Sequence, residues 1–220
     1  MPDDPIKSTR RVLEPYDRIS EVLFGVIMVL TFTGSLSVAT ADQAEVRTML
    51  LGALGCNLAW GIIDAVFYLL GSLAEKGRNR MTYLAVRNAT DPQQAQRLIA
   101  DALPSVVASV LQPAELEAVQ QRLKGLPEPP KHARLDKADW LGALGVFLLV
   151  FVSTFPVAIP FIFMQDAALA LRISNLIAIV MLFALGYAFG RYAGRNPWLA
   201  GILMVIIGAI LVGITTALGG

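Results

Sequence analysis

The 220-residue sequence is poor in the usual soft metal ligands, with one cysteine, Cys56, and one histidine, His132. A single cysteine excludes an intrachain disulfide. One cysteine and one histidine also exclude a cluster of Cys and His metal ligands. Any metal site must therefore use carboxylates, methionine, asparagine or backbone oxygens.

Charged residues are scarce as well. They make up 16% of the chain, against 55% hydrophobic residues, and the mean hydropathy is +0.61. The net charge of +1 provides no bulk positive charge for a nucleic-acid partner. The sequence contains no recognisable nucleotide-binding loop and no nucleophile–base arrangement, so we do not expect an enzyme. The composition predicts an integral membrane protein that resides in a lipid bilayer.

Five apolar runs are long enough to cross a bilayer. A helix rises about 1.5 Å per residue and the hydrocarbon core is about 30 Å thick, so about 20 residues suffice. We therefore predict an all-α protein with five transmembrane helices, at residues 19–39, 50–74, 140–164, 171–192 and 198–218. The predicted domains are a cytoplasmic N-terminal segment (1–18), helices 1–2 (19–74), a helical insertion (75–139) and helices 3–5 (140–220).

The first run also has features of a cleaved signal peptide. Residues 39–41, ATA, resemble a cleavage site. Glu14, Asp17 and Glu21 argue against cleavage, because the region before a signal peptide's apolar core is rarely acidic. Cleavage would leave the topology of the remaining helices unchanged.

Basic residues determine the predicted orientation. All Lys and Arg residues except Arg47 and Arg172 lie in the N-terminal segment, in the insertion or in the turn before the last run. The positive-inside rule therefore places the N-terminus and the insertion in the cytoplasm and the C-terminus outside. The excess of Arg over Lys and the short loops favour a bacterial inner membrane. Within the insertion we predict short helices near 80–88, 91–103, 105–111 and 113–123.

Asp64 lies inside the second apolar run. An intramembrane acid costs at least about 2.5–3.5 kcal/mol on insertion scales and is not expected to face lipid. At helical spacing Asp64 shares a face with Asn57, Gly61 and Tyr68. We predict a role in ion or proton transport; the alternative is a structural hydrogen bond to Asn57 or to a neighbouring helix.

The first run carries a polar stripe at helical spacing, formed by Asp17, Glu21, Met28, Thr31 and Ser35. Counting from the inner ends of the first two runs places Met28 at the depth of Asp64 and Glu21 nearer the cytoplasm. Carboxylates with a thioether suit a borderline divalent metal such as iron(II) or manganese(II). We therefore predict a metal path of Glu21, Met28 and Asp64. In the alternatives, Glu21 pairs with Arg18, Asp17 caps the helix, and Met28 only packs.

Two further groups extend these predictions. Proline in a membrane helix frees backbone carbonyls, so we assign a proton or polar path to Asp17, Asn57, Ser153, Thr154 and Pro156. Small residues four apart allow close helix contact, which makes Gly186, Gly190 and Gly194 either a dimer face or a packing face against the last helix.

The arrangement of spans and insertion, with an acidic start to the first span, resembles the vacuolar iron transporter (VIT) family. The segment 55–61, GCNLAWG, is similar to the family's small-residue second-span segment, and 155–161, FPVAIPF, is similar to its double-proline third-span segment. Asp17-Arg18 stands where the family has Asp-Gly. Leu58 and Ile62 replace the family's Met and Glu, and the insertion lacks paired ExxE glutamates.

The resemblance implies a homodimer that exchanges divalent metal, iron(II) or manganese(II), for protons. The metal is cargo, and no tightly bound cofactor is implied. The missing insertion glutamates favour one alternative, a non-transporting membrane scaffold whose insertion binds a cytoplasmic partner.

Overall fold

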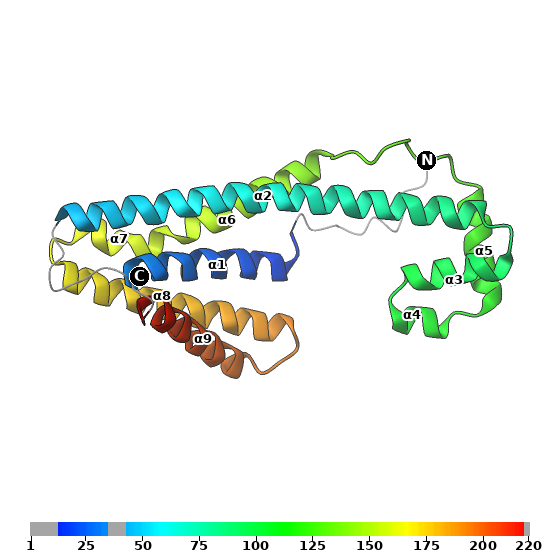
Figure 1. Ribbon diagram of the computed structural model, residues 1–220. Coiled ribbons are helices and arrows are strands. Elements are labelled where there is room, and N and C mark those ends of the chain that lie inside the picture. Colours follow the sequence, from blue (N-terminus) through cyan, green and yellow to red (C-terminus); the bar gives the residue numbers. More distant parts are fainter. Residues whose placement is uncertain (1–12, 35–42, 218–220) are drawn as a thin grey trace, which may run out of the picture. The chain divides into compact units, whose positions relative to one another are not determined.

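The computed structural model describes residues 13–34 and 43–217, and these residues form helices and connecting loops without strands (Figure 1). The helices are α1 (Pro15–Gly34), α2 (Gln43–Asn88), α3 (Pro92–Ala102), α4 (Ser105–Val110), α5 (Pro113–Lys124), α6 (Lys137–Ser153), α7 (Phe155–Phe163), α8 (Ala167–Tyr192) and α9 (Pro197–Ala217). They belong to two compact units. Unit 1 comprises the chain up to Tyr68 and from Lys137 onward, and unit 2 comprises Leu69–Asp136.

Among the described residues, four helical segments are long and apolar enough to cross a membrane: α2, α6 with α7, α8 and α9. The predicted first span is not among them. Its helix, α1, carries Asp17, Arg18 and Glu21 in its first two turns, and residues 35–39 of the predicted run lie outside the described part. A fifth span at α1 stays a prediction.

The second span does not end where the polar insertion begins. We predicted a separate helix at residues 80–88, and this was wrong, because α2 continues for 46 residues through Asn88. The segment contains no proline, so nothing interrupts the helix when its residues turn polar. The helix ends just before Asp91-Pro92, whose Asp91 side chain caps α3 by accepting from the Gln93 backbone N–H.

The third span is divided into α6 and α7 at Thr154. There the backbone N–H of Thr154 donates to the Phe151 carbonyl over a long 3.4 Å. Pro156 follows two residues later and has no N–H to continue the α-helical pattern. The break between α6 and α7 therefore lies beside the two polar residues Ser153 and Thr154.

Helix α1 lies at the centre of unit 1, where it packs against α6, α7, α8 and α9. Val26 and Val29 are fully buried in a cluster with Ala178 and Leu182 of α8. The contact with α6 is close, because a Cβ at Gly25 would overlap Ser153. Residues from widely separated parts of the chain thus enclose the helix that carries Glu21 and Met28.

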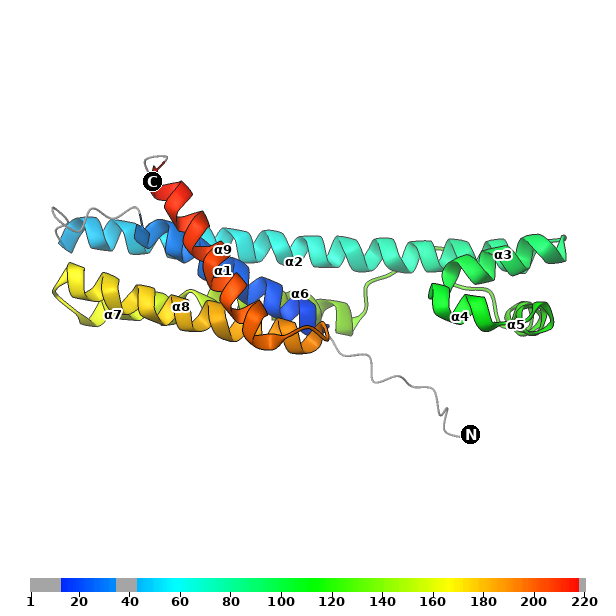
Figure 2. The same cartoon turned by 90° about the horizontal axis from the view of Figure 1, so that it is seen from below.

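Helices α8 and α9 also approach closely, and Figure 2 shows α9 crossing α8 at an angle. A Cβ at Gly186 would lie 2.6 Å from the Ala200 carbonyl, and one at Gly190 would lie 2.8 Å from the Ala200 Cβ. These two glycines thus pack within the chain, as in the second of our two alternatives. Gly194 instead ends α8 with a positive φ of 65°, which favours glycine.

Unit 2 has its own apolar core of Val86, Ile99 and Leu116. The buried Gln120 amide donates to the backbone carbonyls of Val86 and Ala89, at 3.3 and 3.4 Å. A salt bridge of 2.8 Å joins Lys76, near the start of this unit, to Asp136 at its end. The insertion is therefore a folded helical unit.

The close packing of α8 on α9 is testable with a matched pair of substitutions. We expect Gly186→Ala to destabilise the protein by about 1–3 kcal/mol, because the added methyl group meets backbone atoms. Gly213→Ala is the control, since no atom within 4 Å would meet its Cβ. Thermal unfolding in detergent measures the difference, and equal melting temperatures would show that the contact is not tight.

Candidate functional site

Three contacts establish the register between α1 and α2. The rings of Phe24 and Trp60 lie 5.3 Å apart between centroids. One turn further along α1, the Met28 Sδ accepts a weak hydrogen bond from the Cys56 thiol, with 3.4 Å between the sulfurs. Another turn on, Phe32 faces Gly52. Each advance of four residues on α1 matches a retreat of four on α2, so the helices run antiparallel.

Extending this register by one turn places Ser20 level with Asp64, so Glu21 lies one residue, or about 1.5 Å of helix, from the level of Asp64. Asp64 and Asp17 lie close enough to Glu21 for their charges to act on it. The Glu21 and Asp64 side chains are both half-buried. Two carboxylates at close range repel each other unless a proton or a cation lies between them. The arrangement is therefore suited to binding a proton or a cation between the two carboxylates.

The register corrects the predicted depth of Met28. We expected it level with Asp64, but it lies beside Cys56, which is eight residues, or about 12 Å of helix, from Asp64. The prediction counted from the ends of the apolar runs. Those ends do not mark equal depths, because α1 begins at Pro15 and α2 continues past residue 74.

The alternatives for the charged residues are also resolved by geometry. Within the described part of the chain Arg18 forms no salt bridge, so Glu21 is not paired with it. Asp17 accepts a 3.3 Å hydrogen bond from the Glu14 backbone N–H, which is the geometry of a cap at the start of α1. Asp17 thus combines a capping contact with proximity to Glu21.

Asn57 makes its hydrogen bond to Thr154, at 2.6 Å between Nδ2 and Oγ1, and not to Asp64. Both side chains are fully buried. The Asn57 Oδ1 has no partner among the described residues. Turning the amide over would leave the nitrogen unpaired instead, so one buried polar atom stays free in either orientation. Such an atom is a natural point for a water molecule or an ion.

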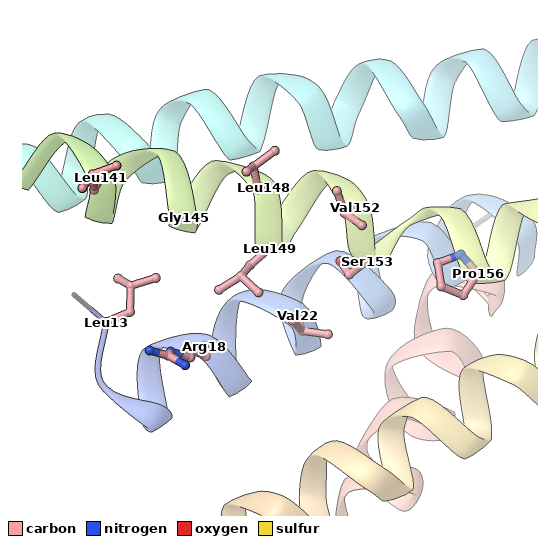
Figure 3. Close-up of a pocket in the computed structure, with 10 residues that line it drawn as sticks. All are labelled: Leu13, Arg18, Val22, Leu141, Gly145, Leu148, Leu149, Val152, Ser153 and Pro156. Atoms are coloured by element: carbon pink, nitrogen blue, oxygen red, sulfur yellow. The ribbon is translucent and has the colours of Figure 1, made fainter. Parts of the chain in front are cut away.

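The remaining predicted path residues face elsewhere. Ser153 donates to the Val150 carbonyl in its own helix at 2.8 Å. Ser153 and Pro156 line a groove of about 610 Å³ between α1 and α6, in which Arg18 and Pro156 lie at opposite ends (Figure 3). The predicted polar path is thus divided, because Thr154 faces Asn57 whereas its neighbours face an apolar groove.

The described residues contain no group of three or more His, Cys, Asp or Glu side chains that could hold a metal ion. One chain thus supplies facing carboxylates, a sulfur pair and a free amide oxygen, but no closed cage. Sequence reasoning missed Cys56 as the partner of Met28. The available signal was its spacing of four and eight residues from Trp60 and Asp64, which places all three on one side of α2.

A comparison with protein-family models matches residues 69–220 to the VIT family. The chain belongs to the VIT family. This confirms the resemblance seen in the sequence. Together with the apolar helices, it identifies an integral multi-pass membrane protein and a membrane transporter of metal ions, since VIT proteins are transporters rather than enzymes. No curated protein matches the chain in sequence.

The matched segment includes the candidate site residues on α6 and α7 but not those on α1 and α2. Ser153, Thr154 and Pro156 lie within it. Glu21 and Asp64 precede its first residue, as do the other predicted ligands on α1 and α2. Family membership thus rests on the insertion and on α6–α9, whereas the roles of the α1 and α2 residues depend on their geometry.

The Asn57–Thr154 contact yields a stability prediction. We expect Thr154→Val to destabilise the protein by about 1–3 kcal/mol, because it leaves the buried Asn57 amide with no partner. The double variant Asn57→Leu/Thr154→Val removes both polar groups and should recover most of the loss. Thr31→Val is the control, since among the described residues Thr31 donates to the Met28 carbonyl of its own helix and to no other group. Thermal unfolding with no difference between Thr154→Val and Thr31→Val contradicts the prediction.

Proposed function

We propose that this VIT-family protein exchanges divalent metal, iron(II) or manganese(II), for protons along α1 and α2. The observation that carries the proposal is the proximity of Glu21 and Asp64, two carboxylates on facing and largely apolar stretches of α1 and α2. Carboxylates are ligands that both metals accept, and they also bind protons. Competition of the two for one pair of carboxylates couples metal movement to proton movement in the opposite direction.

The other α1–α2 groups extend the path. The Met28–Cys56 sulfur pair lies two turns of α2 beyond Asp64, and Asn57 provides a neutral oxygen on the same helix. Thioether and amide ligands hold a borderline metal more weakly than paired carboxylates do. Weak sites beyond a stronger one allow the ion to leave, as conduction through successive sites requires.

We further propose that the transporter is a homodimer. The two facing carboxylates of one chain do not complete the coordination of a divalent ion, and a two-fold related copy would supply a second pair. The side of α2 that carries Trp60, Ile63 and Phe67 is exposed and apolar and adjoins Asp64 at helical spacing, and it is the surface we assign to this contact. In this proposal the N-terminus and insertion are cytoplasmic, the C-terminus is outside, and the host membrane is a bacterial inner membrane.

Transport assays test the role of the carboxylates. In sealed vesicles with a pH gradient, we expect Asp64→Asn and Glu21→Gln each to lower metal-dependent proton flux by at least about tenfold. Glu117→Gln in α5 is the control, because its side chain is exposed and lies in unit 2. Assays with iron(II), manganese(II), zinc(II) and cobalt(II) identify the cargo. Wild-type flux in Asp64→Asn would refute the mechanism.

A second candidate function is a non-transporting scaffold whose insertion binds a cytoplasmic partner. It is favoured by unit 2, a separate compact unit with its own groove of about 520 Å³ and with exposed Val106 and Val110 on α4. If wild-type vesicles show no metal-dependent proton flux, crosslinking of the full-length protein in cells tests the scaffold. Loss of a crosslinked product in Val106→Asp/Val110→Asp would support it.

A further inference from the structure

The groove between α1 and α6 is lined mostly by apolar side chains, as a binding site for a lipid acyl chain would be. Leu148, Leu149 and Val152 form much of its wall, and Arg18 is the one charged residue among the described residues that line it (Figure 3). The Ser153 hydroxyl donates within its own helix, so it presents no free donor to the groove. Walls of this kind offer little to a hydrated metal ion but exclude water from a hydrocarbon chain.

The length and direction of the groove fit one leaflet of a bilayer. Its wall on α6 and the first turn of α7 extends from Leu141 to Pro156, which is about 22 Å of helix and matches the thickness of one leaflet with its headgroup region, about 20–22 Å. Trp140, directly before Leu141, is 59% exposed at the start of this span. Aromatic residues with a polar tip favour the membrane interface. The Arg18 end therefore lies near the interface, and the Pro156 end lies in the hydrocarbon.

The positive charge of Arg18, at the interfacial end of the groove, favours a lipid with an anionic headgroup. Arg18 is exposed and forms no salt bridge with any described residue. A guanidinium binds phosphate oxygens through two parallel hydrogen bonds. In the predicted orientation Arg18 faces the cytoplasmic leaflet, where anionic lipids attract basic residues.

We propose that this groove binds an anionic phospholipid, with one acyl chain along α6 and the headgroup phosphate on Arg18. The site is separate from the facing carboxylates Glu21 and Asp64, and it does not require that the protein transport metal. Its occupant contacts Pro156 and Ser153 next to the break between α6 and α7. Lipid composition would therefore act on the part of the third span that is least regular.

Native mass spectrometry of the full-length protein tests the proposal. The probes are phosphatidylglycerol and phosphatidylcholine with identical acyl chains. We expect wild type to retain phosphatidylglycerol about fivefold more tightly, because its headgroup has a net negative charge, whereas the choline cation of phosphatidylcholine cancels the charge of the same phosphate; attraction of one basic residue to anionic lipid contributes about 1 kcal/mol. Arg18→Gln should abolish this preference, and Arg18→Lys should restore part of it. Arg172→Gln, an exposed arginine at the start of α8, is the control.

A second variant tests the acyl chain. Val152→Trp should fill the groove and weaken retention of both lipids, whereas Val180→Trp at an exposed position of α8 should not. Equal retention of the two lipids by wild type, or unchanged selectivity in Arg18→Gln, would overturn the proposal. So would a change of oligomeric mass in Val152→Trp with lipid retention intact, because the occupant would then be a second copy of the chain.

Discussion

The antiparallel register of α1 against α2 is the constraint on which the candidate site depends. The contacts Phe24–Trp60 and Met28–Cys56 hold the two helices in one alignment, and that alignment brings Glu21 to Asp64. Because side chains four residues apart share a helix face, a shift of one turn would separate the carboxylates by about 6 Å along the axis. The buried contacts of α1 with α6, α8 and α9 hold this helix in place.

The break at Thr154 separates two environments within three residues. Consecutive residues of a helix point about 100° apart, so Thr154 turns toward Asn57 while Ser153 and Pro156 turn toward the apolar groove. In an uninterrupted α-helix, the backbone N–H and C=O groups at this position would hydrogen-bond to each other within the helix. The irregular step is tolerated in a membrane because side-chain hydroxyls and buried contacts occupy the space around it.

The family match and the candidate site fall on complementary parts of the chain. The match begins at Leu69 and includes the insertion and the last helices, whereas Glu21 and Asp64 lie before it. At the positions where the sequence resembles the family's second span, Leu58 and Ile62 replace Met and Glu, and both side chains are exposed in unit 1. The acid that faces α1 is Asp64, two residues after Ile62. The ion-binding function that we propose therefore rests on a carboxylate in a different position of the same helix.

Composition and hydropathy determined the fold class, because crossing hydrocarbon requires long apolar helices whatever their packing. They also singled out Asp64, since an acid in such a helix needs a polar neighbour. The tertiary structure decided which neighbour it has. Periodicity assigns a residue to a face of its own helix, but relative depth depends on where two helices contact each other. That is why Met28 was predicted beside Asp64 and lies beside Cys56, and why only the structure pairs Asn57 with Thr154, 97 residues away in the chain.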